Sequence, residues 1–174
     1  MAGMDKECSF IIKHIFKIRM NDNLASLISS MNGLLLYGPP GTGKSLLASA
    51  IAKQWKKLLP DLEVMYVKGP ALFSKMVGET EEKLREVFTC PSGKSKLVIV
   101  DEIDSLFPSR SGGEQNALNN RVVSQFLSVM DGLEKVSNIF VVGTSNRKDS
   151  IDPAVLRNGR LGLHLQVTYQ NKES

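Results

Sequence analysis

Long hydrophobic runs are absent from this sequence. No stretch of its 174 residues approaches the roughly 18 consecutive apolar residues of a transmembrane helix, so a membrane-spanning fold is not expected. The charged residues Asp5, Lys6 and Glu7 stand where a signal peptide would have its apolar segment, which argues against secretion. We therefore expect a cytoplasmic protein.

Cysteine and histidine are also scarce. Cys8 and Cys90 form no C-x-x-C pair, and two distant reduced thiols agree with a cytosolic chain. His14 and His164 are not spaced like metal ligands. Neither a disulfide framework nor a cysteine–histidine metal site is expected.

A concentrated basic patch is missing as well. The net charge is +4, but the excess is scattered and no basic stripe with interleaved aromatic residues occurs. We therefore expect no direct binding to nucleic acid. With 42% hydrophobic and 23% charged residues, no internal repeat and no low-complexity tract, the chain has the composition of one globular domain.

One stretch concentrates glycine and proline. Residues 38–45 fit the spacing G-x-x-x-x-G-K-[ST], in which backbone N–H groups wrap a row of phosphates. Lys44 would supply a charge near the β- and γ-phosphates, and the Ser45 hydroxyl would bind Mg²⁺. The alternative is a glycine-rich turn with a chance lysine, but a strand pattern before it and a helix pattern after it favour an anion site. The predicted nucleotide-binding residues are Gly38, Pro39, Pro40, Gly41, Thr42, Gly43, Lys44, Ser45 and Leu46.

Apolar periodicity predicts alternating strands and helices. The alternation predicts an α/β fold with a five-stranded, mostly parallel sheet and helices on both faces. Strands are expected at residues 33–37, 63–67, 97–100, 139–142 and 163–167. Helices are expected at residues 8–20, 24–29, 45–57, 70–77, 79–88, 117–130 and 152–156.

Two acidic residues follow the most apolar strand directly. Asp101 and Glu102 come after residues 97–100, and ligands of parallel sheets bind at the carboxyl ends of the strands. Asp101 is suited to hold Mg²⁺, and Glu102 to activate the attacking water. The alternative is a solvated acidic strand end, to which Asp104 adds a third carboxylate.

Polar and basic residues follow the next strand. Asn146 could sense the γ-phosphate, or it could simply satisfy the backbone of the turn from Ser145 to Arg147. Arg157 and Arg160 could reach the γ-phosphate of another subunit. Spacing alone favours the other interpretation of this pair, as cations that offset a helix C-terminus.

Together these motifs resemble the AAA ATPases, and the resemblance covers nearly the whole chain. It rests on the loop at residues 38–45, on the run at 97–104 and on residues 143–147 and 152–160. It implies a P-loop NTPase fold, ATP and Mg²⁺ as ligands, and a homo-hexameric ring that couples ATP hydrolysis to protein unfolding or disassembly.

The resemblance also assigns roles to residues. Lys44 and Ser45 match the phosphate and Mg²⁺ ligands, Asp101 and Glu102 the Mg²⁺-binding and water-activating acids, and Asn146 the sensor. Arg157 and Arg160 match paired fingers that act on the neighbouring subunit. Met76, Val77 and Gly78 match the loop that grips substrate in the central pore, where the family prefers an aromatic residue at position 76.

Within the family, the sequence is most similar to the first ATPase domain of the N-ethylmaleimide-sensitive fusion factors, the vesicle-fusing ATPases. The supporting stretches are residues 3–7, 69–81 and 158–161. This similarity implies SNARE complexes as substrates, a SNAP-type adaptor and a peripheral, partner-mediated association with membranes. The alternatives are another AAA remodelling ATPase (a Cdc48-like unfoldase, a proteasomal ATPase or a microtubule-severing enzyme) or a nucleotide-gated binding module with little turnover.

The resemblance also sets an expectation for domain organisation. Residues 1–174 correspond to the large nucleotide-binding subdomain, so the sequence is expected to be a fragment without the N-domain, the helical lid or the second ATPase domain.

Overall fold

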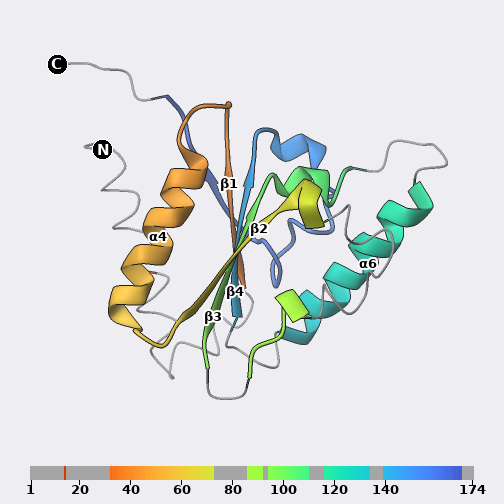
Figure 1. Cartoon of the computed structure of the whole chain (residues 1–174). Coiled ribbons are helices and arrows are strands. Elements are labelled where there is room, and N and C mark those ends of the chain that lie inside the picture. Colours follow the sequence, from red (N-terminus) through yellow and green to blue (C-terminus); the bar gives the residue numbers. More distant parts are fainter. Residues whose placement is uncertain are drawn as a thin grey trace.

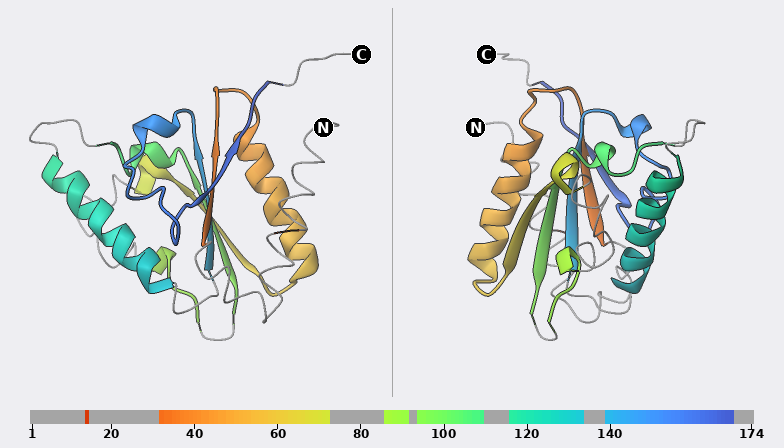
Figure 2. Two further views of the ribbon diagram at one scale, coloured as in Figure 1. Left: turned by 180° about the vertical axis from the view of Figure 1, so that it is seen from behind. Right: turned by 45° about the vertical axis from the view of Figure 1, so that its right-hand side comes forward.

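A parallel sheet between two layers of helix forms the part of the chain that the structure describes. The computed structural model describes residues 32–72, 86–91, 94–109, 116–133 and 139–169, together with His14. Helix α4 (Lys44–Leu58) covers one face of the sheet (Figure 1). Helix α6 (Asn116–Leu133) covers the other face, as the two views of Figure 2 show. No helix within the described residues is long and apolar enough to cross a membrane.

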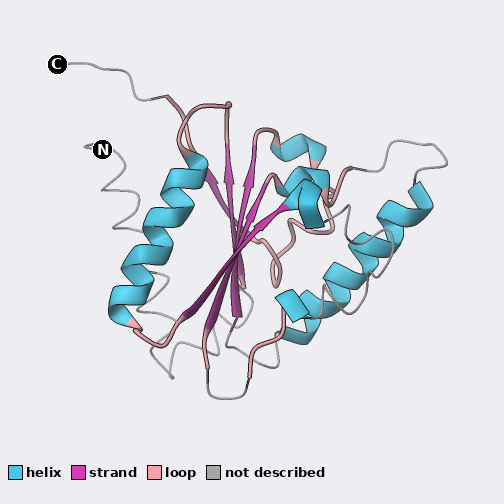
Figure 3. Cartoon of the chain, in the orientation of Figure 1, coloured by secondary structure: helices cyan, strands magenta, loops and turns pink. Residues whose placement is uncertain are grey.

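The sheet has five strands, and every paired neighbour runs parallel (Figure 3). Parallel neighbours need long crossover connections, which helices usually supply. Here α4 lies between β1 and β2 in the chain, and α6 lies between β3 and β4. The spatial order is β2-β3-β4-β1-β5. The strands are β1 (Gly33–Tyr37), β2 (Glu63–Lys68), β3 (Lys96–Asp101), β4 (Ile139–Ser145) and β5 (Leu163–Gln166).

Strand side chains alternate between two hydrophobic cores. Leu34 and Leu36 of β1 pack with Ile51 of α4, whereas Leu35 packs with Phe126 of α6. This alternation follows from the period of two along a strand, and it explains why the interiors of the central strands are apolar on both faces. Each fully buried leucine or phenylalanine contributes about 1.5–3 kcal/mol, so the two cores hold both helices against the sheet.

The carboxyl ends of three central strands meet at one edge. In the β1–β4 register Tyr37 is opposite Ser145, and in the β3–β4 register Val100 is opposite Gly143. The loop after β1, the acids at the end of β3 and the turn after β4 therefore share this edge. Short 3₁₀ helices, η2 (Ile103–Ser105) and η3 (Lys148–Ser150), follow β3 and β4 there.

The structure confirms the predicted fold class and all five strands, with changes at two functional positions. Strand β3 includes Asp101, which was expected to follow the strand. Strand β4 continues to Ser145 instead of ending at residue 142. Gly143 permits this because a Cβ there would lie 2.9 Å from Cδ1 of the buried Ile103. The missing side chain leaves room for η2 to pack on the strand.

The predicted helix at residues 152–156 is wrong. The segment forms turns, in which Ala154 N–H donates to Asp152 Oδ1 (2.9 Å) and Val155 N–H donates to the Asp152 carbonyl (3.0 Å). Asp152 caps the turn as expected, but five residues are too few to nucleate a helix before Asn158 and Gly159 reverse the chain. The predicted helices at residues 8–20 and 24–29, and most of those at 70–77 and 79–88, lie outside the described residues.

Two separate glycine-to-alanine substitutions test how tightly β4 is packed. Gly143→Ala should lower the free energy of unfolding by about 1–3 kcal/mol, because the new methyl group would collide with Ile103 in a filled core. Gly132→Ala in α6 is the control, since a Cβ there meets nothing within 4 Å, and it should be neutral or stabilising by up to about 1 kcal/mol. Urea unfolding of both variants measures the difference, and a Gly143→Ala protein as stable as the wild type would contradict the account of packing.

Candidate functional site

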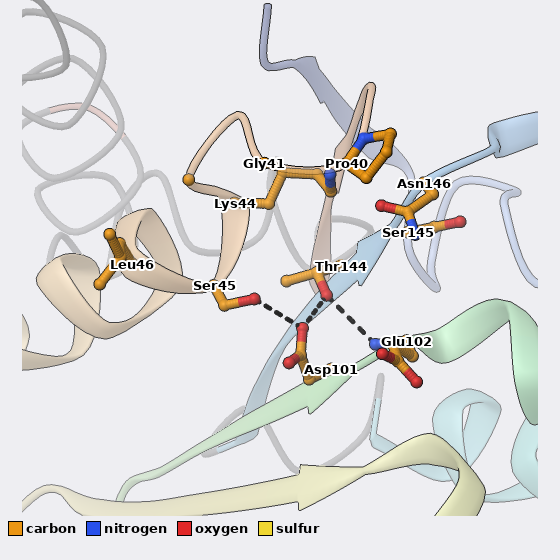
Figure 4. Close-up of a pocket in the computed structure, with 11 residues that line it drawn as sticks. Pro40, Gly41, Lys44, Ser45, Leu46, Asp101, Glu102, Thr144, Ser145 and Asn146 are labelled. Atoms are coloured by element: carbon orange, nitrogen blue, oxygen red, sulfur yellow. Dashed lines mark hydrogen bonds between the residues drawn. The ribbon is translucent and has the colours of Figure 1, made fainter.

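A cavity of about 360 Å³ opens at the carboxyl edge of the sheet (Figure 4). It receives residues from the loop after β1, from the start of α4, and from the ends of β3 and β4. Of the predicted nucleotide-binding residues, Gly38, Pro39 and Thr42 belong to the loop without lining the cavity. The lining residues are Pro40, Gly41, Gly43, Lys44, Ser45, Leu46, Asp101, Glu102, Thr144, Ser145 and Asn146.

The loop of residues 38–45 has the backbone geometry that its glycines allow. Gly41 and Gly43 take φ values of 78° and 86°, in the left-handed region where a Cβ is disfavoured. Gly38 is required for a second reason, because a Cβ there would lie 2.0 Å from the Val167 carbonyl oxygen. Gly43 also directly precedes α4, so the loop leads into the positive end of a helix dipole.

The Lys44 ammonium is turned onto the loop itself. Its Nζ donates to the carbonyl of Gly38 (2.9 Å) and to that of Pro39 (2.7 Å). Burial lowers the pKa of Lys44, while the carboxylates of Asp101 and Asp104 act in the opposite direction. The cation therefore lies inside the candidate phosphate site, held by neutral carbonyls that a phosphate could replace.

Asp101 is at the centre of a small polar network (Figure 4). Its Oδ1 accepts a hydrogen bond from the Ser45 hydroxyl (2.9 Å) and another from the Thr144 hydroxyl. Serine and aspartate oxygens are the hard ligands that Mg²⁺ prefers, and this ion usually takes only one or two protein ligands beside phosphates and water. Ser45 and Asp101 therefore fit the Mg²⁺ site that the sequence predicts.

Glu102 is held in an unusual backbone conformation. Its φ of 55° is the only positive value for a non-glycine residue in the described part of the chain. The Ser105 hydroxyl donates to its carbonyl (2.7 Å), and a Cβ at Gly69 would lie 2.3 Å from that same oxygen. Strain of this kind persists only where the surroundings impose it, and it is concentrated at functional sites. The result is an exposed carboxylate at the mouth of the cavity.

Thr144 is a site residue that the sequence reasoning missed. Besides contacting Asp101, its hydroxyl oxygen accepts a hydrogen bond from the Glu102 N–H (3.2 Å), and the residue is only 2% exposed. It thereby positions both acids from the neighbouring strand. The available signal was a polar residue at the end of an otherwise apolar strand.

Asn146 follows β4 and lines the cavity with an exposed side chain. The alternative role, satisfying the turn backbone, is filled by its neighbour: the Ser145 hydroxyl donates to the Arg147 carbonyl and accepts from the Arg147 N–H, both at 3.0 Å. No hydrogen bond joins the Asn146 side chain to a described residue. Its amide is therefore available to a ligand, and the role as a phosphate sensor stays a prediction.

The two predicted finger arginines do not line the cavity, and they differ from each other. Arg160 donates from Nε and a terminal nitrogen to the two carboxylate oxygens of Asp131 on α6, at 2.8 and 2.9 Å, and from its other terminal nitrogen to the Ala154 carbonyl (2.7 Å). The hydrogen bonds from Arg160 hold the pKa of Asp131 below its ordinary value. Arg157 is exposed and makes no ion pair with a described residue. Arg157 therefore has a side chain that no ion pair with a described residue holds, and the finger role of both arginines stays a prediction.

Comparison with known proteins agrees with this geometry. Residues 34–169 match the model of the ATPase family associated with various cellular activities (AAA). The chain belongs to the AAA family. The family resemblance inferred from the motifs is therefore confirmed.

Several curated relatives have informative names. An "AAA ATPase forming ring-shaped complexes" of Corynebacterium glutamicum (strain R) is 40% identical over 149 residues, which cover 81% of this chain and 28% of the relative. A "Proteasome-associated ATPase" of Frankia alni is 41% identical over 155 residues, covering 82% of this chain and 26% of the relative. A "Cell division cycle protein 48 homolog" of Archaeoglobus fulgidus is 44% identical over 151 residues, covering 86% of this chain and 20% of the relative.

The match is confined to part of each relative. The chain spans between 20% and 28% of the length of these three proteins. The predicted pore-loop residues Met76, Val77 and Gly78 lie outside the described residues. The match therefore establishes the fold and the family, but not the activity, assembly or substrate of the whole protein.

The position of Thr144 generates a stability prediction. Thr144→Val keeps the shape but removes the acceptor for the part-buried Glu102 N–H and the donor to Asp101, so it should lower the free energy of unfolding by about 1–3 kcal/mol. Thr144→Ser retains the hydroxyl and should recover most of that loss. Urea unfolding of the three proteins is the measurement. Equal losses in the valine and serine variants would show that packing, and not the hydroxyl, is what matters.

Proposed function

We propose that this chain is the nucleotide-binding core of a ring-forming AAA ATPase that uses ATP hydrolysis to unfold or separate protein substrates. One observation carries the proposal. A phosphate-binding loop, a Mg²⁺-compatible Ser45–Asp101 pair, an exposed Glu102 and an Asn146 side chain without a hydrogen bond to any described residue surround a single cavity.

Binding would begin with an exchange of partners for Lys44. The ammonium now contacts neutral carbonyls of Gly38 and Pro39. A phosphate oxygen carries a negative charge that these carbonyls lack, so a triphosphate entering the cavity would attract the Lys44 ammonium more strongly than they do. The amides of the glycine-containing loop and the N-terminus of α4 would bind the remaining phosphate charge. Bound Mg²⁺, held through Ser45 and Asp101, would neutralise charge on the phosphates.

Glu102 is the residue placed to act on water. Its exposed carboxylate can accept a proton from a water molecule in the cavity, and the hydrogen bond that its N–H donates to the Thr144 hydroxyl holds the residue in position. Asn146 can orient the same water or contact the γ-phosphate from the neighbouring strand. In this division of roles, Lys44 binds phosphate, Asp101 holds Mg²⁺ and Glu102 activates water, and all three residues lie at the carboxyl edge of the sheet.

The reaction would be completed by another copy of the chain. Arg157 is exposed and does not line the cavity of its own chain. If it acts as a finger, it would therefore contact the nucleotide bound to a neighbouring chain. A ring provides such a neighbour for every site, and the name of the Corynebacterium relative supports ring assembly. For Arg160 to act in the same way, it would first have to leave Asp131.

The substrate is proposed at the level of a class. The named relatives are a proteasome-associated ATPase and a Cdc48 homologue, and these names favour the alternative of a proteasomal or Cdc48-like remodelling ATPase, for which we propose proteins as substrates. The narrower expectation of SNARE complexes presented by a SNAP-type adaptor draws no support from these names. The cytoplasmic location and the membrane association through partners likewise remain predictions.

Replacing the proposed water-activating acid separates binding from turnover. Glu102→Gln should retain Mg²⁺-dependent ATP binding but lower kcat by about 10²- to 10⁴-fold, because the amide cannot accept the proton. Asp61→Asn is the matched control, since this exposed acid precedes β2 at the opposite edge of the sheet, and its turnover should match the wild type. Phosphate release and calorimetric ATP binding are the measurements. If the wild type binds ATP without hydrolysing it, a nucleotide-gated binding module is the better assignment.

Mixing two inactive variants tests whether Arg157 acts in trans. Glu102→Gln and Arg157→Ala chains should each be inactive. In an equal mixture, about a quarter of randomly formed interfaces would pair an intact Glu102 with an intact Arg157 and recover activity.

The control for this mixture combines Glu102→Gln with Lys44→Ala. Both of these changes damage the site side of the interface, so no interface is intact and turnover should stay absent. Activity that returns only in the first mixture supports a finger from the neighbouring chain. If neither mixture regains activity, Arg157 does not act in trans.

A further inference from the structure

The carbonyl groups of the phosphate loop show how its geometry is maintained. Pro39 and Pro40 have no backbone N–H group, so the first half of the loop at residues 38–45 cannot be stabilised by hydrogen bonds from these two positions. Its carbonyls instead accept hydrogen bonds from side chains. Lys44 donates to Gly38 and Pro39, and the Thr42 hydroxyl donates to Pro39 (2.9 Å). The Pro40 carbonyl, at the tip of the loop, accepts a hydrogen bond from the hydroxyl of Tyr169.

Tyr169 reaches the loop because the segment after β5 runs beside it (Figure 1). Val167 N–H donates to the Tyr37 carbonyl (2.7 Å), which extends the pairing of β5 with β1 up to the start of the loop. Gly38 lies directly against the Val167 carbonyl, and a Cβ at Gly41 would lie 3.9 Å from the Tyr169 hydroxyl. Tyr169 is 61% exposed, so the hydrogen bond from its hydroxyl is the specific link between this residue and the loop.

We propose that Tyr169 is a positioning residue for nucleotide binding, and that its hydroxyl holds the phosphate loop in the conformation that receives a triphosphate. This inference rests on the proposed function. The side chains that donate hydrogen bonds to the loop carbonyls respond differently when nucleotide binds. Lys44 has to leave Gly38 and Pro39 to contact phosphate, whereas Tyr169 and Thr42 can remain. After that exchange, Tyr169 is the side-chain donor that still ties the tip of the loop, at Pro40, to the segment after β5.

The expected effect is on affinity and not on the chemical step. A loop without the Tyr169 hydrogen bond would spend part of its time in conformations that cannot bind, and the apparent affinity falls by the fraction that remains competent. A neutral hydrogen bond of ordinary strength corresponds to about a fivefold change. Once ATP is bound, Glu102 and Asp101 are unchanged, so kcat at saturating ATP should stay at the wild-type value.

Calorimetric titration of the 174-residue chain with Mg·ATP provides the test, using Tyr169→Phe and Tyr169→Ala. The phenylalanine variant removes only the hydroxyl, and both variants should bind about fivefold more weakly with unchanged kcat. Tyr66→Phe is the control. Tyr66 is 58% exposed on β2 and its hydroxyl makes no hydrogen bond with a described residue, so its affinity should match the wild type.

The outcomes separate this inference from the proposed function. If the wild type binds and Tyr169→Phe binds equally well, the hydroxyl does not position the loop. Weakening in Tyr169→Ala alone would point to a contact made by the ring and would overturn the proposal, as would equal weakening in Tyr66→Phe. If the wild type itself binds no Mg·ATP, the proposed function fails, and the positioning role of Tyr169 fails with it.

Discussion

The parallel pairing of β4 between β1 and β3 is the constraint on which the rest of the structure depends. It places the ends of three strands side by side, so that the loop after Tyr37, the acids after Val100 and the turn after Ser145 meet without any one segment supplying the whole site. Buried apolar side chains on both faces of these strands fix the register. The polar site is therefore positioned by the packing of two cores beneath it.

The elements that depend on local sequence could be predicted from the sequence. Near-continuous apolar runs mark the buried strands, and a three- and four-residue periodicity marks α4 and α6. The phosphate loop could be recognised because its glycines, lysine and serine each meet a local chemical requirement at a fixed spacing. Asp101 and Glu102 could be placed beside it because the ends of parallel strands share an edge.

Features that depend on distant contacts could not be predicted in this way. Thr144 contacts two acids that lie more than forty positions earlier in the chain, and its polar character at the end of an apolar strand does not show which residues it contacts. Spacing favoured Arg157 and Arg160 equally as cations near a helix end, whereas the position of α6 ties Arg160 to Asp131. The turn at residues 152–156 carried genuine capping signals, but the chain reversal that follows leaves no room for a helix. In each case tertiary packing decided between interpretations that the local pattern left open.

A crystal structure of the chain with Mg²⁺ and a non-hydrolysable ATP analogue tests the central claim most directly. The account predicts a triphosphate along residues 38–45, with the Lys44 ammonium withdrawn from the carbonyls of Gly38 and Pro39 and placed on phosphate oxygens, and with Mg²⁺ beside Ser45 and Asp101. A nucleotide bound elsewhere, or one bound while Lys44 still contacts those two carbonyls, would contradict it.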